Sequence, residues 1–282
     1  MTDENFYIDR FTAIESIKES GIFILSCLLD IYSFNFDYLH NSFISLIMLL
    51  KKIITTAFVA VFASVLANSF ELNTYELDVK DFGELQVVDN LNVIHRCNPD
   101  SAGLAVFTCE KDIVPHILFT NSKNKLKIQT QNDDNVVRSF PTITVYSTYI
   151  QSAENSGDST LIVDSPAPGA EFKARILGNG SLIARDIHST KTEGRLDTGR
   201  GHLVLTGVTR TANLTNIGTG TIEGGNLKSE NCTASVLGTG SIDCQVSNTL
   251  NIRGMGTGKV YFKGNPTIKK RTIGSVKAIQ VE

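Results

Sequence analysis

The chain has 282 residues, of which 41% are apolar and 20% are charged, and its formal net charge is −3. This composition is that of an ordinary globular protein and excludes a disordered chain. The near-neutral charge argues against a nucleic-acid partner, because phosphate binding needs a clustered basic surface. Tryptophan is absent, so an aromatic platform for sugars would have to consist of tyrosine or phenylalanine.

The stretch from Met48 to Ala67 carries a targeting pattern. It reads MLLKKIITTAFVAVFASVLA, with a lysine pair, an apolar run and a small residue before polar sequence. This order predicts a secretory signal peptide over residues 48–67, cleaved after Ala67. The alternative is a membrane anchor, but the 15 residues after the lysines are fewer than the roughly 18–20 that span a bilayer. We therefore expect no stable membrane span in the mature chain.

Residues 1–47 need a separate explanation, because a signal peptide normally stands at the N-terminus. We interpret them as a non-native upstream extension, with translation starting at Met48. Their apolar stretches, GIFILSCLL and NSFISLI, show no helical period. The alternative is that two hydrophobic segments, 21–29 and 41–67, hold an uncleaved protein in a membrane.

Residues 68–282 are expected to form a single domain that begins with a β region over 72–150. There, apolar and polar residues alternate with the period of a strand, and turn-forming clusters occur at 98–103, 121–124 and 132–135. The pattern contains no helix of useful length. We expect this region to start a solenoid and to cover its first coil.

Residues 151–282 contain a repeat in which Gly-x-Gly or a close relative precedes a short alternating segment. Successive first glycines are 18 to 21 residues apart. They are Gly178, Gly199, Gly218, Gly238, Gly256 and Gly274, with a weaker copy at Gly157. Repetition at this period is typical of a solenoid, in which each coil buries its apolar side against its neighbours. The predicted fold is an all-β, right-handed parallel β-helix-like solenoid with coils of about 18–21 residues.

Strand alternation assigns inner and outer side chains to each repeat. The fourth residue after the first glycine points inward in Leu182, Leu203, Ile222, Ile242 and Val260. The sixth residue points inward in Ala184, Leu205, Gly224, Cys244 and Phe262. A second inner ladder is expected from Leu196, Leu214, Ala234 and Ile252. The glycines are expected at corners, where a positive φ or a close backbone approach excludes a Cβ atom.

The third and fifth residues of each repeat point outward and form a flat face of mixed character, which we name the candidate binding face. It consists of Ser181, Ile183, His202, Val204, Thr221, Glu223, Ser241, Asp243, Lys259 and Tyr261. Solenoids commonly use such surfaces for long ligands or partners. The alternative is a sheet face that is only solvated.

Glu223 and Asp243 are outward acids on neighbouring coils, close enough for a calcium site or for acid/base work on a sugar. No further oxygen ligand is indicated, so the alternative is two solvated acids. The histidines of the mature chain show no metal spacing, and we expect surface or turn positions for all of them. They are His95, His116, His188 and His202. The sequence thus predicts no enzyme activity, no catalytic residue, no metal and no cofactor.

Four cysteines remain after the predicted cleavage, an even number that permits disulfides in an oxidising compartment. They are Cys97, Cys109, Cys232 and Cys244. Cys232 is expected to align with Ala212 and Leu250 on the inner wall opposite Cys244. A bridge between Cys232 and Cys244 and a pair of buried free thiols both remain open.

The last coil is rich in basic residues. They are Lys259, Lys263, Lys269, Lys270, Arg271 and Lys277. We expect them to protect the terminal strand against pairing with another edge. Binding of an anionic glycan is the alternative.

The repeated G-x-G-[ST]-[IL] coils and the ending GTGKVYFKGNPTIKKRTIGSVKAI resemble the head GIN domain family of autotransporter adhesins, secreted or surface proteins of Gram-negative bacteria. The likeness runs from about Val79 to Ile279. Its C-terminal motif consists here of Gly258, Val260, Tyr261, Gly264, Pro266 and Gly274. The resemblance implies a β-helix-like fold and brings no catalytic residues with it.

Together these features predict a non-enzymatic, exported binding or structural module of adhesin type, with a glycan or a cell-envelope protein as partner. Its expected location is periplasmic, at the cell surface or secreted. The alternative is a carbohydrate-active lyase or hydrolase acting on a polysaccharide, because right-handed β-helices also host such enzymes. The sequence does not give the oligomeric state.

Overall fold

The computed structural model describes residues 51, 52, 54, 72–131 and 139–282. The predicted upstream extension and almost all of the predicted signal peptide lie outside these residues. The chain divides into two units, 1–69 and 70–282, and the second is described below. Its described residues form strands and two short 3-10 helices, Pro99–Ser101 and Val114–His116, which confirms the predicted all-β class.

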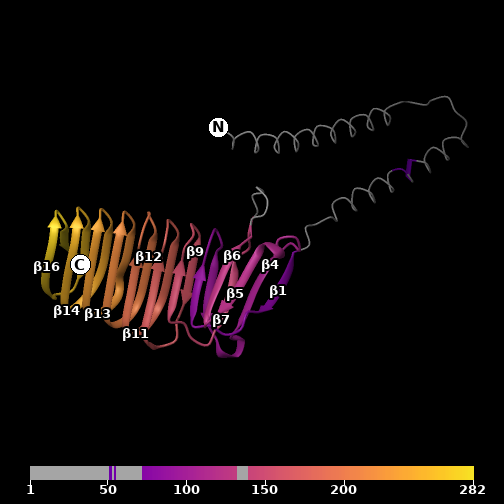
Figure 1. Cartoon of the computed structure of the whole chain (residues 1–282), viewed down its shortest axis with the longest axis horizontal. Helices are drawn as coiled ribbons and strands as arrows, with labels where there is room; N and C mark the ends of the chain where they lie inside the picture. Colours follow the sequence, from indigo (N-terminus) through magenta and orange to yellow (C-terminus); the bar gives the residue numbers. More distant parts are fainter. Residues whose placement is uncertain (1–50, 53, 55–71, 132–138) are drawn as a thin grey trace, which may run out of the picture. The chain divides into compact units, whose positions relative to one another are not determined.

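The strands of this unit lie side by side in a row from β1 to β16 (Figure 1). The N-terminal part contributes β1 (Asn73–Asp78), β2 (Glu84–Val87), β3 (Val93–Cys97), β4 (Leu104–Cys109), β5 (Ile117–Ser122), β6 (Lys125–Thr130) and β7 (Ile143–Ser147). The repeats contribute β8 (Ser152–Asn155), β9 (Thr160–Asp164), β10 (Gly169–Ile176), β11 (Ser181–Leu196), β12 (His202–Gly218), β13 (Thr221–Gly238), β14 (Ser241–Gly256), β15 (Lys259–Lys263), β16 (Thr267–Gly274) and β17 (Lys277–Gln280).

Parallel pairing of successive coils produces a β-solenoid of about six turns. Two walls of strands enclose its core. Wall A contains β6, β2, β8, β10, the C-terminal halves of β11 to β14, and β16. Wall B contains β7, β3, β9, the N-terminal halves of β11 to β14, β15 and β17. The long strands β11 to β14 therefore serve both walls.

The first coils are not stacked in chain order. The coil that holds β2 and β3 lies between the coil of β6 and β7 and the coil of β8 and β9. At the N-terminal end, β1 pairs with β4, β4 with β7 and β5 with β6, all antiparallel. This interleaving is absent from the sequence pattern, because it depends on pairing between segments that are far apart along the chain.

The first inner ladder is confirmed. Leu203, Ile222, Ile242 and Val260 are neighbours in the parallel register and are fully buried. The second predicted ladder was shifted at one end, because Leu196 pairs with Asn216 and not with Leu214. Gly194 takes the place next to Leu214. Leu196 is still buried, so the shift concerns the register and not the direction of the side chain.

The glycine corners are also confirmed. Gly218 has a φ of 145°, which lies in the region that side chains with a Cβ avoid. At Gly220, a Cβ would lie 2.3 Å from the carbonyl oxygen of Gly201 on the preceding coil. The buried Asn216 side chain holds the corner, since its Nδ2 donates to the carbonyls of Gly220 at 2.8 Å and Ser241 at 3.0 Å.

The expectation of a surface position was wrong for His95. This side chain is fully buried in β3, with its Nε2 2.7 Å from Ser147 Oγ and its ring edge toward Phe82. Burial lowers the pKa of His95 to about 4, although the charge of Asp81 acts in the opposite direction. The alternation of β3 explains the position, since His95 follows the inward Val93 by two residues.

All four cysteines of the solenoid are free thiols. Cys232 has the predicted alignment with Ala212 and Leu250. Its side chain is hydrogen bonded to Cys244, and this bond together with burial raises the pKa of Cys232 well above its ordinary value. In this structure the two thiols form a buried pair, which corresponds to the second of the two alternatives.

Candidate functional site

The candidate binding face lies on the outer side of wall B as two rows in register. One row joins Ser181, His202, Thr221, Ser241 and Lys259, and the other joins Ile183, Val204, Glu223, Asp243 and Tyr261. All ten side chains are half-buried or exposed. The backbone hydrogen bonds of the parallel sheet fix their spacing, with neighbouring strands about 4.8 Å apart. The structure therefore places these ten residues side by side on one face.

The two acids of this face lie in different electrostatic environments. Glu223 accepts a hydrogen bond from His202 Nε2 at 2.7 Å, so one of its oxygens is already engaged by the neighbouring coil. Asp243 pairs with Glu223 in the register. Its pKa is raised by burial and, to a lesser degree, by the negative charge of Glu223.

A hollow of about 280 Å³ opens beside Asp243. Its lining includes Ser241, Asp243, Tyr261, Lys263 and Val281. The hollow therefore combines a carboxyl group, a phenol and an ammonium group with one apolar side chain. This set suits a small polar group, such as a sugar ring or a peptide side chain, at the C-terminal end of the face.

A larger groove of about 640 Å³ follows the corner between the two walls. Its floor carries the hydroxyl groups of Ser189, Thr209 and Ser229, which are aligned on successive strands. Its rim includes Val208, which is exposed, and Lys228, which pairs with Val208 in the register. The groove runs across the coils and is thus open to an extended ligand.

Sequence reasoning missed this groove, although the varying repeat length is a signal for it. The stretch from Gly224 to Cys232 is two residues longer than that from Cys244 to Leu250, yet both connect the same two inner ladders. The register shifts between adjacent coils occur in this corner. Most differences in coil length are therefore absorbed here. One further residue is taken up at the Gly-x-Gly corner after β11, since His202 follows Leu196 by six positions whereas Thr221 follows the paired Asn216 by five.

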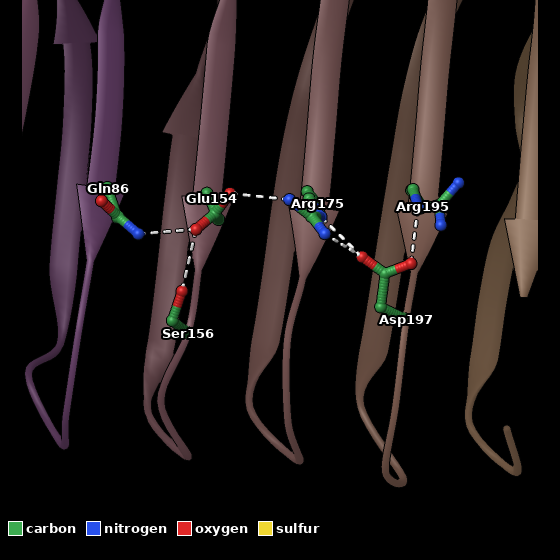
Figure 2. A network of polar contacts seen from close by, with 6 residues as sticks. All are labelled: Gln86, Glu154, Ser156, Arg175, Arg195 and Asp197. Atoms are coloured by element: carbon green, nitrogen blue, oxygen red, sulfur yellow. Dashed lines mark hydrogen bonds and ion pairs between the residues drawn. The ribbon is translucent and has the colours of Figure 1, made fainter. Parts of the chain in front are cut away.

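Wall A carries a network of polar side chains that form hydrogen bonds and ion pairs with one another (Figure 2). Gln86 donates to Glu154 at 2.7 Å, and Arg175 contacts both Glu154 and Asp197. Arg195 donates to the second oxygen of Asp197. Arg175 and Arg195 are neighbours in the register, and Asp197 contacts both of them. Because each charged group of this network already has an oppositely charged partner, this part of wall A holds the coils together and has no unpaired charge for a ligand.

Within the described ranges, no three His, Cys, Asp or Glu side chains lie close enough together to hold a metal ion. The exposed His188 contacts Asp186 at 3.0 Å, and the His116 ring contacts the Gln131 carbonyl at 3.2 Å. The same part of the chain contains no helix that is long and apolar enough to cross a membrane.

Several solved structures have a similar fold. An adhesin of Bacteroides fragilis, described as putative, superimposes with a TM-score of 0.66 at 23% identity, over 75% of this chain and 98% of that one. A protein of Parabacteroides distasonis described as a putative lipid-binding protein gives 0.62 at 18%, over 76% and 98%. A putative adhesin of Parabacteroides merdae gives 0.58 at 16%, over 76% and 98%. At these identities the likeness concerns the fold.

No curated protein matches the chain. A family model described as "Putative auto-transporter adhesin, head GIN domain" matches residues 81–266, which lie within the range expected from the sequence. This match covers well over half of the chain and includes the repeats that build both walls. The chain therefore belongs to the head GIN domain family of putative auto-transporter adhesins.

Proposed function

We propose that this protein is an exported, non-enzymatic binding module that recognises a glycan or a protein of the cell envelope through the candidate binding face. The observation that carries the proposal is the pair of outward rows on wall B, held in register by five parallel strands. Membership in an adhesin family supports the same reading.

The physical character of the face suits recognition. A rigid sheet loses little conformational freedom on binding, so more of the contact energy is kept as affinity. Apolar Ile183 and Val204 lie in the same row as Tyr261, among hydroxyl and charged groups. Aromatic residues commonly dominate binding energies, so we assign the anchor role to Tyr261.

Binding can be tested on an array of glycans and envelope proteins with Tyr261→Ser and a matched control. We expect at least a tenfold loss of affinity for Tyr261→Ser, since removal of an aromatic anchor residue costs about 2 kcal/mol or more. Tyr149→Ser removes an exposed tyrosine elsewhere and should leave affinity unchanged. An array without any saturable ligand would contradict the proposed function, and equal losses in the two variants would contradict the face.

Export is proposed from the signal-peptide pattern of residues 48–67. We expect the mature protein to begin at Asn68 in the periplasm, on the cell surface or in the medium. N-terminal sequencing of the protein from fractionated cells checks this. A cytoplasmic protein that retains residues 48–67 would refute it.

A second candidate function is a polysaccharide lyase or hydrolase, which one observation favours. Burial and the neighbouring Glu223 raise the pKa of Asp243, and a carboxyl group with a raised pKa beside a second carboxyl group is the arrangement of a general acid and its partner. Release of sugars or unsaturated products from a polysaccharide panel tests this function. Any activity should disappear in Asp243→Asn and Glu223→Gln, and activity that survives in both variants would remove these acids as its source.

A further inference from the structure

The residue that precedes the first glycine of a coil forms an outward apolar ladder on wall A. Leu237 pairs with Met255, and Met255 pairs with Ile273 on β16. Their exposed fractions rise along the ladder, from 39% to 54% to 73%. We name these three residues the apolar ridge.

Single exposed apolar side chains are ordinary on protein surfaces, whereas a contiguous row of them marks an interaction site. Backbone hydrogen bonds between successive corners keep the ridge in place, since Thr257 N donates to the Gly238 carbonyl at 3.0 Å and Ser275 N to the Gly256 carbonyl at 2.8 Å. The corner therefore cannot fold its apolar side chains inward without breaking the sheet.

A row of free cations runs beside the ridge. Arg253 and Arg271 are neighbours in the register, each two residues before a ridge residue, Met255 or Ile273. Lys269 precedes Arg271 by two residues on the same face of β16. All three are exposed and make no ion pair with any described residue. Arg195 belongs to the same outward row farther along wall A, and there it is neutralised by Asp197 (Figure 2).

The charge at this end of the solenoid selects an anionic occupant. The stretch 259–282 holds six basic residues and one acid, although the whole chain has a net charge of −3. A second copy of the chain is disfavoured, because pairing β16 with another β16 would bring the basic side chains of both strands together. A polyanion without an apolar part would leave the ridge in water. A bilayer with anionic headgroups meets both requirements.

We propose that the apolar ridge and its basic row form a peripheral docking site for an anionic membrane surface. Leu237, Met255 and Ile273 enter the headgroup region, and the cations contact lipid phosphates. Three apolar side chains give weak, reversible attachment that falls with salt. This site goes beyond the proposed function, because it lies on wall A and leaves the candidate binding face on wall B free for a partner.

The chain lacks tryptophan, so Met255→Trp introduces a single fluorescent probe into the ridge. With vesicles of phosphatidylglycerol, we expect its emission to move to shorter wavelengths and to be quenched by brominated lipid chains. Vesicles of phosphatidylcholine should have no such effect. Val208→Trp places the same probe at an exposed apolar position in the groove and should not respond, even if another part of the chain attaches the protein to the vesicle.

The charge requirement is tested in the Met255→Trp protein. Arg253→Gln with Arg271→Gln should lower the vesicle partition coefficient about 25-fold, since each cation near an anionic surface contributes roughly a factor of five. Lys228→Gln, at an exposed lysine on the groove, should change it less than twofold. An unaltered spectrum with phosphatidylglycerol, an equal response of Val208→Trp, or a shift that depends only on protein concentration would overturn the proposal.

Discussion

The buried imidazole of His95 makes the stability of the solenoid depend on pH. Ser147 Oγ donates to the Tyr149 carbonyl at 2.9 Å, so it accepts a hydrogen bond from His95 Nε2. The other nitrogen, Nδ1, is buried without a hydrogen-bond partner. Protonation would therefore place a charge and an unsatisfied N–H in the core, which is why burial lowers the pKa of His95 to about 4.

The sign and size of the effect follow from linkage. In the unfolded chain the His95 pKa returns to 6.5, so below that pH the unfolded state binds a proton that the folded state excludes. Stability is then complete above pH 6.5 and is lost as the pH falls toward the folded pKa of about 4. Over this window the loss amounts to about 3 kcal/mol, at 1.36 kcal/mol per pKa unit.

Urea unfolding of wild type and His95→Gln between about pH 7 and pH 4 measures this loss. Glutamine keeps an N–H donor for Ser147 but cannot titrate. Acids that do not interact with His95 contribute equally to both proteins, so the difference between their free energies of unfolding should shift by about 3 kcal/mol in favour of the variant. A difference that stays constant with pH would refute the buried neutral imidazole.

Three further substitutions test the packing of the coils by denaturant unfolding. Ile242→Ala removes a fully buried side chain between two like neighbours and should cost about 2–5 kcal/mol, whereas the outward Ser241→Ala should stay within about 0.5 kcal/mol of wild type. Gly220→Ala places a Cβ against a carbonyl oxygen at 2.3 Å and should cost about 1–3 kcal/mol. Gly225→Ala is the control, since its Cβ would make only an ordinary contact, 3.8 Å from Asp243 Cβ. Asp197→Asn removes the negative charge that Arg175 and Arg195 share and should cost about 1–3 kcal/mol of unfolding free energy.

The sequence predicted wall B well because its strands follow the Gly-x-Gly corner directly. From each first glycine the chain makes the same turn, so period-two counting gives the correct direction for Ile242 and Asp243. The same count fails on wall A, which lies beyond the corner of variable length. For this reason Leu196 was placed two residues out of register, next to Leu214 instead of Asn216.

The burial of His95 and the apolar ridge could be predicted from the sequence only in part. His95 stands two residues after Val93 in an alternating strand, so its inward direction could have been read from the pattern, but its partner Ser147 lies 52 residues away. The sequence shows directly that Met255 and Ile273 each precede the first glycine of a coil. Their outward direction follows only from the register of wall A, which local pattern does not contain.

Footprinting of surface tyrosines tests the central claim, that the candidate binding face contacts an envelope partner, without knowledge of the ligand. The protein is bound to isolated cell envelopes, its tyrosines are chemically modified, and the extent of modification at each position is measured by mass spectrometry. The account predicts that Tyr261 is protected by the envelopes while Tyr149, exposed away from this face, is modified as in free solution. Equal modification of Tyr261 with and without envelopes, under conditions in which the protein is bound, would contradict it.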